Sequence, residues 1–110
     1  MTAAWADRRC GPCGGGVLPY THEQAIAALT QIDPLWQLSE DGRHIERLFR
    51  FKDYYRVMSF VNAVAHIAHI EDHHPDLKVS YQSCLVRFTT HEIKGLSDND
   101  FICAAKIDRL

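Results

Sequence analysis

The chain has 110 residues, of which 46% are hydrophobic and 24% charged, and its formal net charge is −2 at pH 7. This length and composition are typical of one globular domain with a single hydrophobic core. No basic block is present to neutralise phosphates, and no apolar run approaches the ~20 residues of a membrane span. The sequence therefore disfavours direct nucleic-acid binding and a membrane protein. Because Asp7, Arg8 and Arg9 stand where a secretory signal would have its apolar core, we expect a cytoplasmic protein.

Residues 1–19 are rich in glycine and lack hydrophobic periodicity, which predicts a flexible leader before a domain over residues 20–110. The leader contains one C-x-x-C pair, Cys10 and Cys13. A structural zinc site needs four nitrogen or sulfur ligands, and the nearest further candidate is His22. The pair belongs either to a metal site or to a flexible tail, and its role stays open.

The first ordered segment reads as a helix followed by a hairpin. Thr21 and Gln24 form a capping-box pattern, and the apolar residues after them recur at helical spacing, which predicts a helix over residues 22–32. Over residues 36–51 the period of the apolar residues changes to two, around an Asp-Gly pair at 41–42. Asp-Gly between alternating apolar residues is typical of a β-hairpin.

The longest amphipathic pattern begins after Asp53, a residue that can cap a helix, and its apolar residues recur at i, i+3, i+4 and i+7. Pro75 removes a backbone donor and disfavours the α conformation at His74. We therefore expect the helix to stop near Asp72, which leaves the two adjacent histidines just past its end.

Two further strands and a last helix complete the predicted order. Apolar residues alternate over residues 79–81 and again over 86–88, and Ser97 with Asp100 forms a second capping pattern before an apolar stripe. Strand pairs joined by hairpins, with helices between them, favour a single antiparallel sheet. The sequence predicts an α+β domain of order α-β-β-α-β-β-α, a four-stranded antiparallel sheet with three helices packed on one face.

Five of the seven histidines lie in one stretch of the chain, at His66, His69, His73, His74 and His91. The ordinary pKa of imidazole, ~6.5, lies near neutral pH, so paired histidines can donate and accept protons in one turnover. His66, His69 and His73 also have spacings that place imidazoles on one helical face, as in several zinc sites. The cluster indicates either proton transfer or metal binding.

The sequence motifs around these histidines resemble those of the pterin-4a-carbinolamine dehydratase family over residues 36–108. The matching residues are Glu71 to Pro75, Tyr81, Thr89 to Glu92, Gly95 to Ser97 and Asp100, with Trp36 and Phe49 to Asp53 upstream. The resemblance is specific, because it requires H-H-P and T-H-E at a fixed spacing, with His73 and His91 eighteen positions apart. His69 stands where the family often has Glu, so its role stays open.

This resemblance implies a chemistry that suits histidine. Members of the family remove water from 4a-hydroxytetrahydropterin, which aromatic amino-acid hydroxylases leave when they use tetrahydrobiopterin, and they form quinonoid dihydropterin. The departing hydroxyl needs a proton, and the neighbouring ring nitrogen must lose one, so an acid and a base must flank one carbon. Two imidazoles can supply both near pH 7, and the resemblance implies neither a metal nor another cofactor.

The resemblance also implies roles for single residues. His73 and His91 would form the acid/base pair, and His74 would help to hold and polarise the substrate. The substrate-binding residues that it implies are Asp72, Thr89, Thr90, Glu92, Asp100 and Trp36. Asp100 would support His91 or the pocket rim, but it is equally explained as a helix-capping residue. Trp36 is explained equally well as a core aromatic.

The family suggests partners and one alternative function. A sheet with helices on one face leaves its other face partly apolar, and the family covers such a face by self-association, so we expect a homodimer or homotetramer. A functional link to an aromatic amino-acid hydroxylase is expected as well. Animal members also act as dimerisation cofactors of a homeodomain transcription factor, so a non-catalytic binding protein of the same fold is the alternative.

Overall fold

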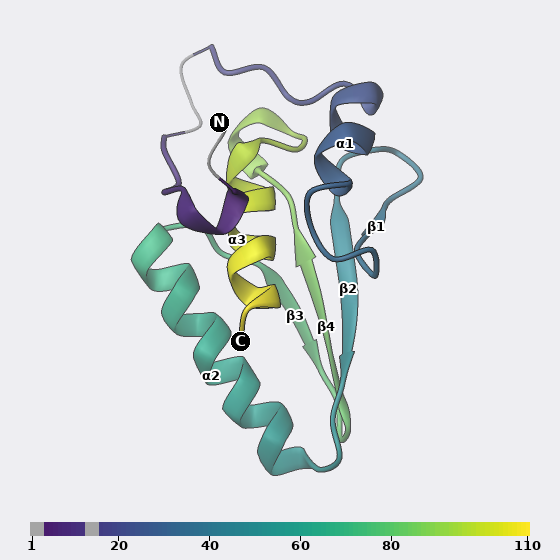
Figure 1. Cartoon of the computed structure of the whole chain (residues 1–110), viewed down its shortest axis with the longest axis vertical. Coiled ribbons are helices and arrows are strands. Elements are labelled where there is room, and N and C mark those ends of the chain that lie inside the picture. Colours follow the sequence, from purple (N-terminus) through teal and green to yellow (C-terminus); the bar gives the residue numbers. More distant parts are fainter. Residues whose placement is uncertain (1–3, 13–15) are drawn as a thin grey trace.

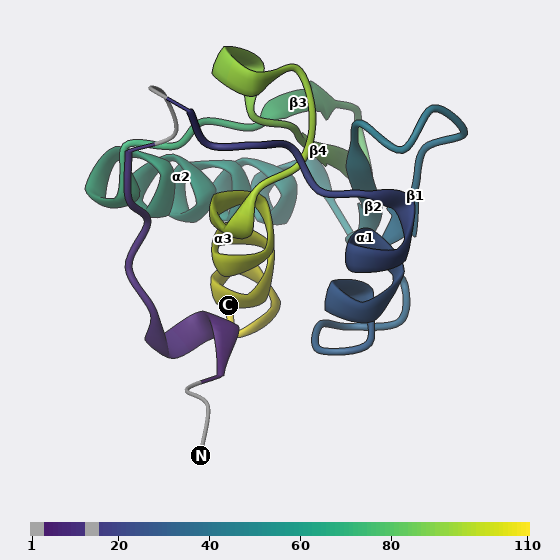
Figure 2. The ribbon, with the colours of Figure 1, turned by 90° about the horizontal axis from the view of Figure 1, so that it is seen from above.

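The computed structural model describes residues 4–12 and 16–110. Its helices are α1 (His22–Leu29), α2 (Tyr54–Glu71) and α3 (Asp98–Asp108), with two short 3-10 helices, η1 (Trp5–Asp7) and η2 (His91–Ile93). Its strands are β1 (Gln37–Leu38), β2 (Ile45–Arg50), β3 (Asp76–Val79) and β4 (Ser83–Phe88) (Figure 1). All neighbouring strands are antiparallel, in the order β1-β2-β4-β3. Figure 2 shows the three helices on one face of this sheet, so the predicted fold class is confirmed.

Side-chain caps begin the helices where the sequence places them. Thr21 and Gln24 form a capping box at α1, Asp53 accepts the Arg56 backbone N–H at the start of α2, and Ser97 caps α3. Each cap provides an acceptor for a backbone N–H that has no partner within the helix. The helix starts were therefore predictable from local sequence.

Two elements end earlier than predicted, and one strand begins later. The first helix stops at Leu29 rather than near residue 32, because the Thr30 hydroxyl donates to the Ala27 carbonyl and the following residues make tighter i to i−3 bonds. β1 excludes Trp36, whose N–H donates to the Asp33 carbonyl in a turn. β3 ends before Tyr81, which lies within the predicted strand but is 73% exposed in the turn before β4, where the Ser80 N–H donates to the Ser83 carbonyl. At each of these three positions, hydrogen bonds of a turn set the limit of the element, rather than the apolar pattern of the sequence.

The core lies between the sheet and the helices. Alternate residues of β4 point into it, including Val86 and Phe88, and they meet Val57 and Val64 of α2 and Phe101 of α3. No helix in the described residues is both long and apolar enough to cross a membrane.

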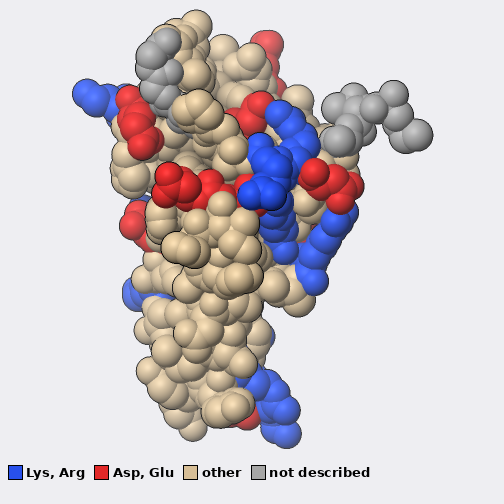
Figure 3. All heavy atoms as spheres, turned by 90° about the vertical axis from the view of Figure 1, so that its left-hand side faces the viewer, with Lys and Arg blue, Asp and Glu red and all other residues tan. Residues whose placement is uncertain are grey.

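The first described segment, residues 4–12, lies against α2 and α3. The Trp5 ring stacks on Phe101 at 5.8 Å, and Arg8 pairs with Asp98 at 2.9 Å. Charged side chains gather over this part of the molecule, whereas the lower part of the same face is largely uncharged (Figure 3). These contacts differ from the leader expected from the glycine-rich sequence. The domain boundary at residues 19 and 20 stays a prediction.

Cys10 of this segment lies close to a buried cysteine. Its Sγ is 3.6 Å from Sγ of Cys103 in α3, and its N–H donates to Glu71 Oε1 at 2.8 Å. Cys13, the other member of the C-x-x-C pair, lies outside the described residues. Within residues 4–12 and 16–110, no three His, Cys, Asp or Glu side chains form a group able to hold a metal ion.

Candidate functional site

His73 lies directly after the end of α2, as predicted. Asp72, the C-cap residue, adopts a left-handed conformation with φ 51°, and the His73 N–H donates to the Ala68 carbonyl at 3.2 Å. A left-handed C-cap closes a helix because it turns the next N–H groups back to the last carbonyls. Pro75 then prevents any return to helix before β3. This local geometry turns the chain from α2 toward the sheet at the two histidines.

The His73 ring is buried and paired with a carboxylate of α3. Its Nε2 lies 2.7 Å from Asp100 Oδ1, and the two side chains are 10% and 0% exposed. The ring also lies parallel to the Phe88 ring of β4, at 5.8 Å and 7°. Residues from three elements thus set the position and the plane of one imidazole.

Asp100 is held by its own set of donors. Its Oδ2 accepts the Ser97 backbone N–H at 2.9 Å, which is half of the capping box of α3, and the Thr90 hydroxyl at 2.8 Å. Asp100 stands in the first turn of α3, where the helix dipole favours a negative charge. The capping interpretation of Asp100 is confirmed through Oδ2, while Oδ1 lies against His73 rather than His91, so a site role of Asp100 stays a prediction.

The third part of the site is the loop between β4 and α3. Thr90 pairs with Gly95 in an isolated β-bridge that closes η2, and Lys94 is left-handed with φ 55°. Gly95 is packed so closely that a Cβ there would lie 2.7 Å from Cβ of Pro19. This close approach explains the glycine of the G-L-S motif. Figure 1 shows this loop, the end of α2 and the start of α3 at the same end of the molecule.

Seven of the nine predicted site residues form two groups. Hydrogen bonds connect His73, Asp100 and Thr90, which are all buried. The exposed group consists of Asp72 and His74 after α2, and His91 and Glu92 in η2. Exposed side chains at these two segments are available to a substrate, whereas Asp100 and Thr90 are available to hold in place the His73 ring, which is 10% exposed.

Two predicted substrate-binding residues take other positions. Trp36 is only 4% exposed, and its Nε1 donates to Asp108 at the far end of α3, so it is a core aromatic here. Thr89 is buried, and its hydroxyl donates to the Arg43 carbonyl at 2.6 Å. We omit Trp36 from the candidate site and regard Thr89 as a support of the loop. Phe88 was expected only as a strand residue, since nothing in the sequence marks it as the platform of His73.

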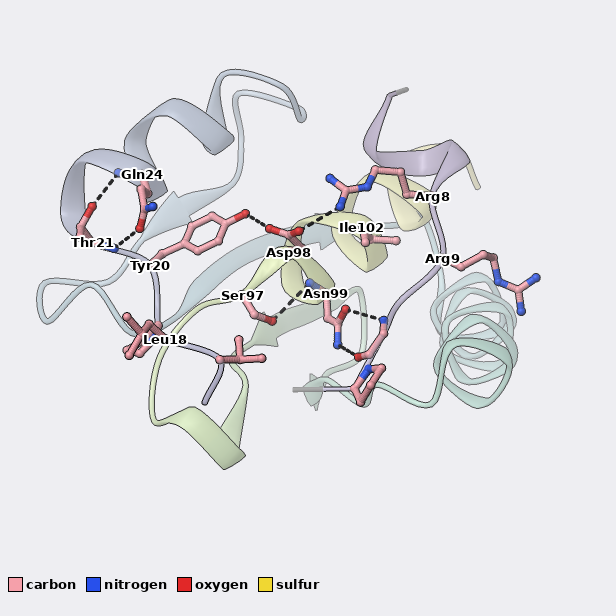
Figure 4. Close-up of a pocket in the computed structure, with 14 residues that line it drawn as sticks. Arg8, Arg9, Leu18, Tyr20, Thr21, Gln24, Ser97, Asp98, Asn99 and Ile102 are labelled. Carbon is pink, nitrogen blue, oxygen red and sulfur yellow. Dashed lines mark hydrogen bonds and ion pairs between the residues drawn. The ribbon is translucent and has the colours of Figure 1, made fainter. Parts of the chain in front are cut away.

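A separate pocket of about 540 Å³ lies at the α3 N-terminus (Figure 4). It is lined by parts of the first segment, by the start of α1 and by Asp98, to which the Tyr20 hydroxyl and Arg8 are bonded. Burial and the neighbouring Asp98 carboxylate raise the pKa of Tyr20. None of the nine predicted site residues lines this pocket.

The fold and the site together define a class of protein. The chain is a small α+β domain in which a buried His–Asp pair joins the end of α2 to the start of α3, with exposed histidines in the segments that follow α2 and β4. This arrangement is suited to proton transfer, because imidazole can exchange protons near neutral pH and the carboxylate fixes its orientation.

Comparisons with known proteins identify the family within that class. The sequence model of the pterin 4 alpha carbinolamine dehydratase family matches residues 18–110, and the chain belongs to this family. A relative from Nitrosomonas eutropha, provisionally named a pterin-4-alpha-carbinolamine dehydratase, is 56% identical over 105 residues, 96% of this chain and 91% of the relative. A relative of the same provisional name from Legionella pneumophila (strain Corby) is 49% identical over 110 residues, 100% of this chain and 97% of the relative.

Solved structures agree with this assignment. A transcriptional coactivator/pterin dehydratase from Brucella melitensis is 30% identical with a TM-score of 0.78, and the match covers 83% of this chain and 96% of that chain. A pterin dehydratase-like protein described as a RuBisCO assembly factor in the alpha-carboxysome has a TM-score of 0.59 at 16% identity, over 67% and 86% of the two chains. The second likeness concerns the fold alone.

Proposed function

We propose that the chain is a hydro-lyase that dehydrates 4a-hydroxytetrahydropterin to quinonoid dihydropterin, with His73 and His91 as the acid/base pair. The observation that carries this proposal is the buried pairing of Asp100 with His73, the first histidine of the H-H-P sequence, within the region that matches the family. A histidine that only occupied a solvent-exposed position at the end of a helix would not need a buried carboxylate partner.

The chemistry assigns separate tasks to the two histidines. One imidazolium protonates the leaving hydroxyl at C4a, and one neutral imidazole takes the proton from the adjacent ring nitrogen as the C=N bond forms. His74, Asp72 and Glu92 are exposed beside them and would hold the polar edge of the pterin. The product would return to tetrahydropterin by reduction. The protein would thus be a recycling partner of an aromatic amino-acid hydroxylase, and we propose that it acts in the cytoplasm.

The direct test is dehydration of freshly generated 4a-hydroxytetrahydropterin, followed by ultraviolet absorbance. We expect acceleration without added metal, and no loss of activity in excess chelator, because imidazoles alone perform both proton transfers. His22→Ala serves as the control, since His22 is exposed in α1 and has no predicted role in the dehydratase site. Loss of activity in chelator and its return with zinc would refute the metal-free mechanism and favour the histidine metal site.

A binding function without catalysis is the second candidate. The Brucella melitensis structure that shares this fold at 30% identity is described as both a transcriptional coactivator and a pterin dehydratase. The same assay separates the two functions, because a pure binding protein would not accelerate dehydration over the uncatalysed rate.

A further inference from the structure

The imidazole of His73 has a defined orientation, and its hydrogen-bond partners determine where its proton lies. Neutral histidine carries one N–H and one free lone pair, and the partner of one nitrogen decides which nitrogen is the base. Nε2 lies 2.7 Å from Asp100 Oδ1, so Nε2 is the nitrogen whose partner is known.

Oδ2 of Asp100 accepts hydrogen bonds from two donors. The Ser97 backbone N–H can only donate, and it reaches Oδ2 at 2.9 Å; the Thr90 hydroxyl donates to the same oxygen at 2.8 Å. Both donors, together with the first turn of α3, favour the ionised carboxylate. An ionised carboxylate has no proton to give, so Oδ1 requires a donor from Nε2.

Thr90 is suited to maintaining this state. It is 1% exposed, the Gly95 bridge fixes its backbone, and its hydroxyl also lies 2.7 Å from Ser97 Oγ. Removing the hydroxyl would leave Oδ2 with one donor fewer in a fully buried place, where an uncompensated charge is costly. The carboxylate would also lose a donor that fixes its orientation, so Oδ1 would be held less firmly opposite Nε2 and the preference of the His73 proton for Nε2 would weaken.

We propose that Asp100 and Thr90 are positioning residues that keep the proton of His73 on Nε2, so that Nδ1 is the atom that exchanges a proton with the substrate. The part that concerns the substrate rests on the proposed function. The position of the proton on the His73 ring is a property of the protein alone and does not depend on the proposed function.

Long-range ¹H–¹⁵N NMR of labelled protein reads the tautomer of His73 directly. The spectrum is recorded at about pH 8.5, two units above the ordinary histidine pKa of ~6.5. We expect the wild type to carry its proton on Nε2 alone. A ring protonated on Nδ1 at this pH, as the other tautomer or as imidazolium, would overturn the proposal, and this measurement needs no variant to fold.

Three threonine variants then test the role of Thr90. We expect Thr90→Val to show mixed or reversed tautomers of His73 and to lower kcat by about 10-fold or more with little change in KM, because one hydrogen bond to a charged group is lost. Thr90→Ser keeps the hydroxyl and should restore both readouts. Thr30→Val is the matched control, because its hydroxyl donates to the Ala27 carbonyl at the exposed end of α1.

The two readouts separate this inference from the proposed function. An unchanged His73 tautomer in folded Thr90→Val would refute the role of Thr90. If the tautomers behave as expected but the wild type does not dehydrate the pterin, the proton assignment stands and the proposed function fails.

Discussion

His73 and His91 are the side chains on which the proposed chemistry depends. If each moves a proton in the transition state, replacing either with Ala should lower kcat by about 10²–10⁴ and change KM little, because that interaction exists only as bonds break. Steady-state dehydration kinetics with circular dichroism to confirm folding measure this. A folded His73→Ala variant with wild-type kcat would return the buried His73–Asp100 pair to a purely structural role.

His74 follows His73 but is exposed, so we expect a different kinetic signature. If it mainly holds the pterin ring, His74→Ala should raise KM and preserve more of kcat than His73→Ala does. His22→Ala again provides the baseline for an exposed histidine outside the site. Equal loss of kcat in the His73 and His74 variants would show that both histidines act in the chemical step.

His69 tests whether the departure from the family pattern matters. It is exposed in the last turn of α2, where the helix dipole favours a positive charge. We expect His69→Ala to keep near-normal kcat if the residue is a bystander, and His69→Glu to do so if it replaces the more usual carboxylate. A large loss of kcat in both variants would make His69 a third proton donor.

The C-terminal end of α2 depends on Glu71 for its connection to the rest of the fold. Its buried carboxylate is 2.9 Å from Lys106 Nζ of α3, accepts the Cys10 N–H at 2.8 Å and lies 3.3 Å from Arg9. Burial on its own would raise the pKa of Glu71, but these three partners lower it below its ordinary value of 4.5. Glu71 directly precedes the turn that presents His73, so it ties this turn to α3 and to the first segment.

Glu71→Gln should therefore destabilise the protein by about 1–3 kcal/mol at pH 7, since the partly buried Lys106 loses its charged partner. The carboxylate has a lowered pKa in the folded state, so its stabilisation is full above about pH 4.5 and is lost as the pH falls through the folded pKa. Urea unfolding of both proteins between about pH 7 and pH 3 should show the difference shrinking in acid.

The exposed Glu40 provides the control for this series, and Glu40→Gln should change stability little at any of these pH values. A Glu71→Gln variant as stable as the wild type at pH 7 would mean that desolvation of the carboxylate offsets its ion pairs.

The sheet of the whole molecule has one face without helices and one incomplete edge. Leu48 of β2 is 41% exposed and lies opposite Leu85 of β4. β1 pairs with Ile45 and Glu46 only, so within the described chain the rest of β2 has no partner strand on that side. A hollow of about 610 Å³ lies here, with Leu35 and Phe51 among its lining residues. Apolar surface next to an unpaired strand favours association with another chain.

We therefore expect the protein to be at least a dimer. Light scattering at micromolar concentration should give a mass of at least twice that of one chain. Leu48→Arg should weaken association because it places a charge in the apolar hollow, whereas Leu110→Arg, at an exposed terminal position, should not. A monomeric wild type at this concentration would contradict the expectation.

Much of the molecule follows from patterns that are local in the chain. The caps at Thr21, Asp53 and Ser97, the stop before Pro75 and the Asp-Gly turn act over a few residues, so the helix starts and the hairpins could be predicted. Alternation and helical periodicity then placed the apolar faces and with them the fold class. The family itself was recognisable because its histidine motifs lie at fixed spacing along the chain.

The partner of His73 could not be read in this way. Asp100 is 27 residues away and was assigned to His91 or to the pocket rim, because the pairing arises only when α3 packs against the end of α2 and β4. The position of Trp36 in the core, rather than at the pocket, depends on the same packing of α3, through Asp108. Local hydrogen bonds and apolar periodicity depend on residues that are close in the sequence. The partner of a side chain across the core depends instead on how distant elements pack together.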